Sequence, residues 1–244
     1  MTHRHIFAEL GWSVRAVGEE VHGEAEVIPA LLVPGAECLR VSVLAAWADH
    51  LMGLVAAQIV APRVPATLEL DVQLLEPAPS AGRVRGRGRL LKSGRSVVFA
   101  AVDFFDARGR RFAIAGGSFM LAGDPNLRLP AKLSLDLPDQ PAVLTIPFAQ
   151  RAGCTVREQG VAVLERREDG LNSSNTINGG LLALAAEEAL RSRYEGQMLC
   201  SLALRYLRPC RVGPAVAIAE RHGSLGVVEI RDERLAVVGS ARVF

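Results

Sequence analysis

The sequence predicts an α+β protein made of two similar halves, each with one long helix and an antiparallel sheet. Three observations support this prediction. A proline-rich stretch divides the 244 residues near their middle, the same order of strand, helix and strands occurs on both sides of it, and the two sides align in register. A chain of this length is sufficient for two domains of about 100–120 residues each.

The proline-rich stretch covers residues 122–144 and shows neither helical nor strand periodicity. It contains Pro125, Pro130, Pro138 and Pro141. Because proline fixes φ and lacks a backbone donor, we interpret this stretch as a linker or an extended crossover. The predicted organisation is therefore a first domain at 12–121, the linker at 122–144, and a second domain at 145–244.

The first half starts with an alternating strand at 19–28. The next segment, 39–60, is rich in Ala and Leu and is too long for one strand, so it predicts a buried helix. Turn residues then separate four predicted strands, at 66–77, 82–93, 95–106 and 110–121.

The second half has the same order. A strand at 160–168 precedes a helix at 179–194. Four more strands are predicted at 201–210, 214–223, 227–233 and 235–244. We expect the four strands after each helix to form an antiparallel meander.

The two halves align in two blocks. A shift of 138 places Val41 on Gly179 and Asp49 on Glu187. A shift of 132 places the Leu-Glu-Pro at 75–77 on the Leu-Arg-Pro at 207–209, and Gly94 on Gly226. One gap of six therefore separates two long blocks, and such an internal repeat is a strong indicator of the whole fold.

Composition argues against several functional classes. The net charge of +2 and the lack of a basic stripe with interleaved aromatic residues argue against nucleic-acid binding. The four cysteines have no metal-ligand spacing and sit among apolar neighbours, so we expect core thiols and no bound metal or cofactor. The N-terminus lacks a secretory h-region, and we expect no apolar stretch long enough to span a bilayer, so we predict a soluble cytoplasmic protein.

The first chemical signal is a carboxylate on each apolar helix, Asp49 in the first half and Glu187, beside Glu188, in the second. An ionised carboxylate is costly to bury without partners, so it faces a partner, a cleft or solvent. A solvated helix face or a salt bridge between the halves would be the simpler explanation. The same register of the acid in both halves favours a functional role.

The second signal lies directly before the second helix, where Asn178 precedes Gly179 and Gly180. Asn178 can cap the helix, and the glycines leave the first backbone N–H groups unobstructed. A helix N-terminus with free N–H groups stabilises developing negative charge, as an oxyanion hole requires. An ordinary N-cap with a glycine hinge is the alternative.

At these residues the chain resembles hotdog-fold thioesterases of the phenylacetate-pathway and 4-hydroxybenzoyl-CoA type. Their motif has an Asn, a His-Gly-Gly six positions later, and an acid nine positions after the His. Asn172, Asn178-Gly179-Gly180 and Ala186-Glu187 stand at these spacings, with Asn178 in place of the His.

The first half matches the same motif only at its acid, Asp49 after Ala48. Arg40-Val41-Ser42 replaces the His-Gly-Gly, and Pro34 replaces the Asn. The resemblance spans 12–121 and 145–244. It implies two tandem hotdog domains, each a long helix wrapped by an antiparallel sheet, fused into an intramolecular pseudo-dimer.

The resemblance also implies active sites shared between the halves, with the oxyanion N–H from one helix N-terminus and the acid from the other helix. Site one combines Asp49 with Asn172, Asn178, Gly179 and Gly180. Site two combines Glu187 with the turn at 40–42, which lacks the glycine pair. We therefore expect site one to be the catalytic one.

The expected reaction is hydrolysis of an acyl-CoA thioester. The Gly179 N–H would hold the thioester oxygen, Gly180 would allow a close approach, and Asp49 would act as general base or as nucleophile. Asn172 and Asn178 would orient water or the carbonyl. Neighbouring His50 points about 100° away from Asp49 on a helix and is a weaker candidate.

Arg95, beside the predicted turn after 82–93, is the expected contact for a CoA phosphate. We expect the chain to associate further into a homodimer or homotrimer. Two alternatives stay open: a non-catalytic acyl-binding or CoA-binding protein on the same scaffold, since fold does not imply function, and a hotdog hydratase or dehydratase. The second would need an Asp and a His before a helix, and no His precedes either helix closely.

Overall fold

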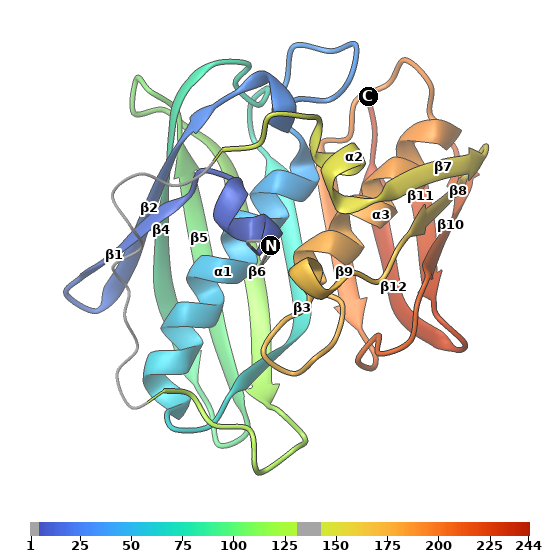
Figure 1. The fold of residues 1–244 in the computed structure, drawn as a ribbon. Helices are drawn as coiled ribbons and strands as arrows, with labels where there is room; N and C mark the ends of the chain where they lie inside the picture. Colours follow the sequence, from blue (N-terminus) through green and yellow to red (C-terminus); the bar gives the residue numbers. More distant parts are fainter. Residues whose placement is uncertain (1–4, 131–142) are drawn as a thin grey trace.

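The computed structural model describes residues 5–130 and 143–244. Two long helices lie on one face of a single antiparallel sheet (Figure 1). In chain order the elements of the first half are η1 (Ile6–Glu9), β1 (Ser13–Val17), β2 (Glu20–Val27), η2 (Pro29–Leu31), α1 (Val41–Val60), β3 (Pro65–Leu74), β4 (Gly82–Ser93), β5 (Val97–Phe105) and β6 (Arg111–Leu121). Those of the second half are α2 (Phe148–Ala152), β7 (Cys154–Glu158), β8 (Val161–Leu164), η3 (Glu168–Gly170), α3 (Gly179–Arg193), β9 (Ser201–Tyr206), β10 (Ala215–His222), β11 (Leu225–Arg231) and β12 (Leu235–Arg242).

The strand order is symmetric about its middle: β1-β2-β4-β5-β6-β3-β9-β12-β11-β10-β8-β7. The two halves meet where β3 pairs antiparallel with β9. In that pair Asp71 lies opposite Ala203, and Leu70 lies opposite Leu204. A shift of 132 takes residue 71 to 203, so these two residues lie on a pseudo-twofold axis, and the predicted register of the strand block is confirmed.

The starts of the two long helices confirm the block that is aligned by a shift of 138. α1 begins at Val41 and α3 at Gly179, which is the predicted shift of 138. The two helices contact each other and cover the inner face of the sheet, and most of the buried apolar side chains form one continuous core. The two tandem hotdog domains therefore form one intramolecular pseudo-dimer.

The predicted meander was wrong in one respect. In each half the strand that follows the helix pairs with the last strand of its half, β3 with β6 and β9 with β12. A seven-residue connection after β3 and an eight-residue connection after β9, both of which contain prolines, carry the chain across to the next strand. The strand after the helix is thereby free to form the contact between the halves.

The sequence analysis also missed β1 and β7, the two edge strands. Most of their residues after the first one or two are exposed, so the alternation that marks a half-buried strand is weak. Each is joined to its partner by a tight turn in which a glycine, Gly18 or Gly160, has a positive φ.

Helix α1 contradicts our expectation that no apolar segment is long enough to span a bilayer. By length and hydropathy it is the one helix in the described residues that could cross a membrane. However, 61% of its apolar window is buried inside the protein, as in the core helix of a globular domain.

Only part of the predicted linker can be compared with the structure. Residues 122–130 pass the segment that follows α1. There the Leu129 N–H donates a hydrogen bond to the Pro62 carbonyl oxygen, and the backbones of Arg63 and Arg128 form an isolated antiparallel β-bridge. Residues 131–142 of the linker lie outside the described residues. The domain boundaries therefore stay predictions.

Candidate active site

The N-terminus of α3 is held by the loop that precedes it. The Asn172 Oδ1 accepts hydrogen bonds from the backbone N–H groups of Ser174 and Thr176, at 2.9 and 3.2 Å. The Asn178 Oδ1 caps the helix by accepting the Gly180 N–H at 2.9 Å. Among the described residues, the Gly179 N–H has no acceptor. A free donor is therefore available at the start of α3.

Both asparagines thus stabilise the loop and the helix cap through their carbonyl oxygens. The role in orienting water or substrate that the sequence analysis gave to Asn172 and Asn178 is left to their amide NH2 groups, and it stays a prediction.

Gly180 brings the start of α3 against α1. A Cβ on Gly180 would lie 2.8 Å from the Ala46 Cβ and 2.8 Å from the Phe7 ring, closer than side-chain contacts allow. Ala46 lies one turn of helix before Asp49. The glycine therefore permits the close approach that brings the α3 N-terminus near the acid of α1.

Asp49 is half-buried and has no cationic partner in the described part of the chain. Its Oδ1 accepts a hydrogen bond from the Thr67 hydroxyl at 2.8 Å. Burial raises the pKa of Asp49 to about 6, although the hydrogen bond from Thr67 lowers it. Asp49 is therefore a carboxylate that titrates close to neutral pH, as a general base does.

Tyr206 connects this acid to the start of α3. Its hydroxyl donates to the Gly179 carbonyl oxygen at 3.0 Å. Burial, and then the nearby charge of Asp49, raise the pKa of Tyr206 well above its usual value. Asp49, Thr67, Tyr206 and the Gly179 peptide consequently surround one place between α1, α3 and the β3–β9 pair.

The sequence analysis missed Thr67 and Tyr206. In β3 the inward positions are Leu70 and Val72, so simple alternation would turn Thr67 outward. A bulge between Thr67 and Glu69 changes the register and aims Thr67 inward. Tyr206 could have been found, because it continues the inward alternation of Leu202 and Leu204 in β9.

His50 also lies near this place. Burial, together with the charge of His5, lowers the pKa of His50 to about 4, so its ring is neutral at pH 7. The His5 Nε2 lies 2.9 Å from the Leu171 carbonyl oxygen, and Phe7 lies beside Gly180. The N-terminal segment of the chain therefore covers the loop before α3.

Site two differs in every one of these contacts. Glu187 is buried, with 1% of its side chain exposed. Its Oε1 accepts the Val41 N–H at 2.9 Å, which is the α1 counterpart of the free Gly179 N–H. Its Oε2 accepts from the Ser42 hydroxyl and from the Arg40 Nη1, the latter at 3.0 Å. The acid of site two therefore occupies the helix N-terminus that would receive an oxyanion.

Arg40 completes the closure of site two. Its side chain is fully buried, and its Nη1 also donates to the Glu188 Oε1 at 2.6 Å. Burial alone would lower the pKa of Arg40, but the charges of Glu187 and Glu188 keep it above its usual value. The salt bridge between the halves that the sequence analysis weighed as an alternative is thus present, at Glu187 and not at Asp49.

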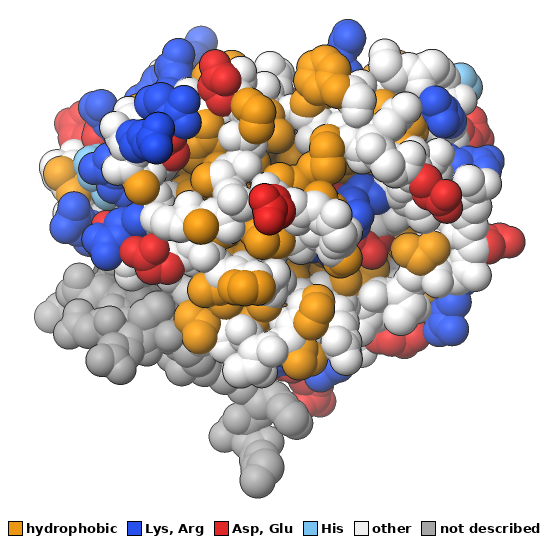
Figure 2. Space-filling view, turned by 90° about the horizontal axis from the view of Figure 1, so that it is seen from above, with side chains coloured by type: hydrophobic (Ala, Val, Ile, Leu, Met, Phe, Trp, Pro, Cys, Tyr) orange, Lys and Arg blue, Asp and Glu red, His pale blue; other side chains and the backbone are white. Residues whose placement is uncertain are grey.

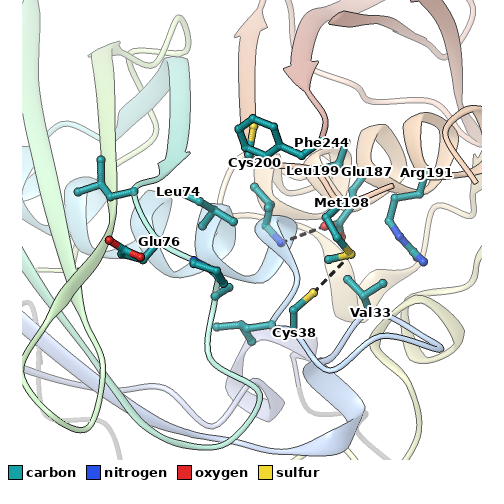
Figure 3. A pocket seen from close by; sticks show the side chains of 15 residues that line it. Val33, Cys38, Leu74, Glu76, Glu187, Arg191, Met198, Leu199, Cys200 and Phe244 are labelled. Carbon is teal, nitrogen blue, oxygen red and sulfur yellow. Dashed lines mark hydrogen bonds between the residues drawn. The ribbon is translucent and has the colours of Figure 1, made fainter. Parts of the chain in front are cut away.

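An apolar cavity of about 270 Å³ lies beside the closed site two. Leu74 and Leu199 line it (Figure 3). The shift of 132 makes these leucines the counterparts of Tyr206 and Thr67. The strand pairing supports the equivalence of Thr67 and Leu199, because each lies opposite the last strand of its own half or its continuation. Thr67 lies opposite Phe119 in β6, and Leu199 lies opposite Val243, which directly follows β12. The polar partners of the acid in site one are therefore replaced by leucines in site two.

The remaining candidate, Arg95, is exposed in the turn between β4 and β5. Val98, Phe119 and Thr67 lie side by side across β5, β6 and β3. The Arg95 turn is thus at the same end of the sheet as site one, and its contact with a phosphate stays a prediction. Within the described ranges, no three His, Cys, Asp or Glu side chains are placed to hold a metal ion.

Comparison with known protein families finds a match in the first half of the chain. Residues 42–113 match the family model of the thioesterase superfamily. A search of curated proteins found no match.

Solved structures extend the likeness to nearly the whole chain. An acyl-ACP thioesterase from Bacteroides thetaiotaomicron is 14% identical, with a TM-score of 0.65 over 93% of this chain and 98% of that one. The 12:0-ACP thioesterase from Umbellularia californica is 13% identical, with a TM-score of 0.68 over 94% and 99%. The tesB protein of Mycobacterium avium subspecies paratuberculosis is 14% identical, with a TM-score of 0.63 over 98% and 97%. The chain therefore has the tandem hotdog fold of these structures, and residues 42–113 of its first half are similar in sequence to the thioesterase superfamily.

Proposed function

We propose that this protein hydrolyses acyl-CoA thioesters to a free acid and CoA, and that it does so at site one only. The observation that carries the proposal is the contrast between the two acids. Asp49 has a raised pKa and, over residues 5–130 and 143–244, no cationic partner, and it lies near a helix N-terminus whose Gly179 N–H is free in the same residues. Glu187 is neutralised by Arg40 and blocks its own helix N-terminus.

In the proposed reaction the thioester oxygen accepts the Gly179 N–H, which also stabilises the negative charge of the tetrahedral intermediate. The Asp49 carboxylate takes a proton from water as the water oxygen attacks the thioester carbon. The C–S bond then breaks, and the thiolate of CoA takes up the proton. In the alternative route the carboxylate attacks the thioester carbon directly, the C–S bond breaks to release the CoA thiolate, and water then hydrolyses the resulting anhydride to regenerate Asp49 and release the free acid.

The choice of CoA as carrier depends on Arg95. Two of the solved structures similar to this chain are named as acyl-ACP thioesterases, so an acyl carrier protein is the competing carrier. If Arg95 contacts a CoA phosphate, Arg95→Ala should raise KM for acyl-CoA by about tenfold, the effect of losing one charge-assisted hydrogen bond. The KM for the matching acyl-pantetheine, which lacks the nucleotide, should not change. Homo-oligomer formation and a cytoplasmic location stay predictions from the sequence.

The deciding experiment is a thiol-release assay on acyl-CoA substrates of increasing chain length, repeated on acyl-ACP. Asp49→Asn should lower kcat by about 10²–10⁴-fold, the usual contribution of a general base. Glu187→Gln, assayed below its melting temperature, should keep kcat within a few-fold of the wild type. The reverse pattern would move the reaction to site two.

The non-catalytic acyl-binding alternative is favoured by one observation, that Asn178 replaces the histidine of the family motif and that its oxygen is occupied by the helix cap. If this alternative is correct, calorimetry will detect acyl-CoA binding while no substrate of the panel releases thiol above the buffer rate.

A further inference from the structure

The cavity beside site two has no role in the proposed reaction, because its helix acid, Glu187, is bound by Arg40, Val41 and Ser42. Its walls come from both halves of the chain: the loop before α1, the end of β3, the segment before β9 and the C-terminal residue. Its apolar or weakly polar lining residues include Val33, Cys38, Leu74, Met198, Leu199 and Cys200. The lining suits a hydrocarbon chain, because each buried CH2 group contributes about 0.8 kcal/mol.

The charged groups at this cavity differ in how available they are to a ligand. Both carboxylate oxygens of Glu187 accept hydrogen bonds, Oε1 from Val41 and Oε2 from Arg40 and Ser42, and Arg40 compensates its charge. Arg191 lines the cavity, and its one ion pair within the described residues is with Glu188, at 3.4 Å. Glu188 itself makes a shorter contact with Arg40, at 2.6 Å. Arg191 is therefore the cation that remains available to a ligand.

The arrangement of these groups is visible in Figure 3. Arg191 and Glu76 lie on opposite sides of the cavity, with Cys38 and Met198 between them. A ligand carboxylate beside Arg191 would thus be distant from the carboxylate of Glu76. Seen from above, this end of the molecule has apolar side chains across its middle and charged side chains mostly around the rim (Figure 2). Leu75 and Phe244, which line the cavity, are exposed, so the cavity is open at the surface.

We propose that the cavity at site two binds a free alkyl carboxylate, with the chain among the leucines and the carboxylate on Arg191, and that it does so without catalysis. A free acid of this kind is the product class of thioester hydrolysis. Binding itself requires only the cavity and Arg191, so it does not depend on the proposed reaction at site one. The neutral counterparts, a fatty alcohol or methyl ester, share the chain and lack the charge.

The test is calorimetric titration of the full chain with decanoate, hexanoate and decanol. Decanoate should bind up to about 10²-fold more tightly than hexanoate, because four more CH2 groups are buried. Arg191→Gln should weaken decanoate binding about tenfold or more and leave decanol binding unchanged. Arg193→Gln, two positions along α3 and outside the cavity, is the matched control and should bind decanoate as the wild type does.

A second measurement avoids substitutions near the core. Cys38 and Cys200 line the cavity, whereas Cys154 and Cys210 are buried elsewhere. Saturating decanoate should slow maleimide labelling of Cys200 several-fold and leave the other pair as slow as before. If Cys200 labels at the same rate with and without decanoate, or if Arg191→Gln binds decanoate unchanged, the cavity is not the binding site. Loss of hydrolysis in Asp49→Asn with unchanged protection of Cys200 would separate this site from the reaction at site one.

Discussion

In the part of the chain that the structure describes, the Gly179 N–H at the start of α3 has no acceptor, and the facing acid, Asp49, has no cationic partner. At the start of α1 the Val41 N–H is bound by Glu187, and Glu187 is bound by Arg40. The two places are related by the same pseudo-twofold axis. The comparison shows that a carboxylate at a given register of a helix is not catalytic by position. Its neighbours decide whether its charge is available for chemistry or used for stability.

The first way to test this comparison is by stability at site two, where the largest effect is expected. Glu187→Gln leaves Arg40 buried with only Glu188 as an anionic partner. Removing one member of a buried ion pair costs about 3–5 kcal/mol, and the remaining Glu188 places the expected loss near 3 kcal/mol. Chemical denaturation measures it. Adding Arg40→Met should recover part of the loss, because the uncompensated charge is removed. If Glu187→Gln unfolds at the wild-type denaturant concentration, the ion pair does not stabilise the closed site.

The second test uses pH at site one. The pKa of Asp49 is about 6 in the folded chain, above the 3.8 of the unfolded chain, so the folded state holds its proton longer. Ionised Asp49 therefore destabilises the fold as pH rises from about 4 to 6. Between pH 4 and pH 7, the free energy of unfolding of Asp49→Asn should therefore rise relative to that of the wild type by about 2 kcal/mol. A constant difference across this range would show that Asp49 has an ordinary pKa.

Activity should change in the opposite direction to stability. Because the base must be ionised, kcat/KM should rise with pH about a midpoint near 6 and then level off. Thr67→Val removes a hydrogen bond that lowers the pKa of Asp49, so the midpoint should move to higher pH. Leu199→Val, at the equivalent position of site two, is the control and should leave the midpoint unchanged.

The third test concerns the close contact of the helices. Gly180→Ala places a methyl group 2.8 Å from the Ala46 Cβ, so the start of α3 must move away from α1. Such overpacking costs about 1–3 kcal/mol. Because the same movement separates Gly179 from Asp49, kcat should fall as well. Ser42→Ala, near the N-terminus of α1, lowers stability without an effect on kcat if only site one is catalytic.

The smallest effect is expected at Tyr206. Tyr206→Phe keeps the ring and removes the hydrogen bond to the Gly179 carbonyl. The loss should be about 0.5–1.5 kcal/mol, or several-fold in kcat/KM. Leu74→Met, at the equivalent position of site two, should leave kcat/KM as it is. An effect of 10²-fold for Tyr206→Phe would instead indicate that the hydroxyl contacts the substrate.

The sequence predicted the features that depend on periodicity and repetition. The blocks shifted by 138 and 132 predicted both helix starts and the place of the pseudo-twofold axis. The motif at 172–187 predicted which helix N-terminus is open. The features that depend on register and long-range contact were missed. A bulge turns Thr67 inward, and no pattern in one strand shows a bulge in advance. The burial of Arg40 beneath Glu187 joins residues 147 positions apart in the chain, and a lone arginine before a helix indicates nothing of it.

The pairing of β3 with β9 has a consequence for the activity of the protein at low concentration. In a homodimer, dilution would separate the acid from the helix start that it faces. Here the two belong to one polypeptide, so the local concentration of each around the other is fixed by the chain and not by the cell. A single molecule can therefore carry a complete site. Fusion also lets each half change independently, which a symmetric pair of identical chains cannot do, because every substitution would appear in both sites at once.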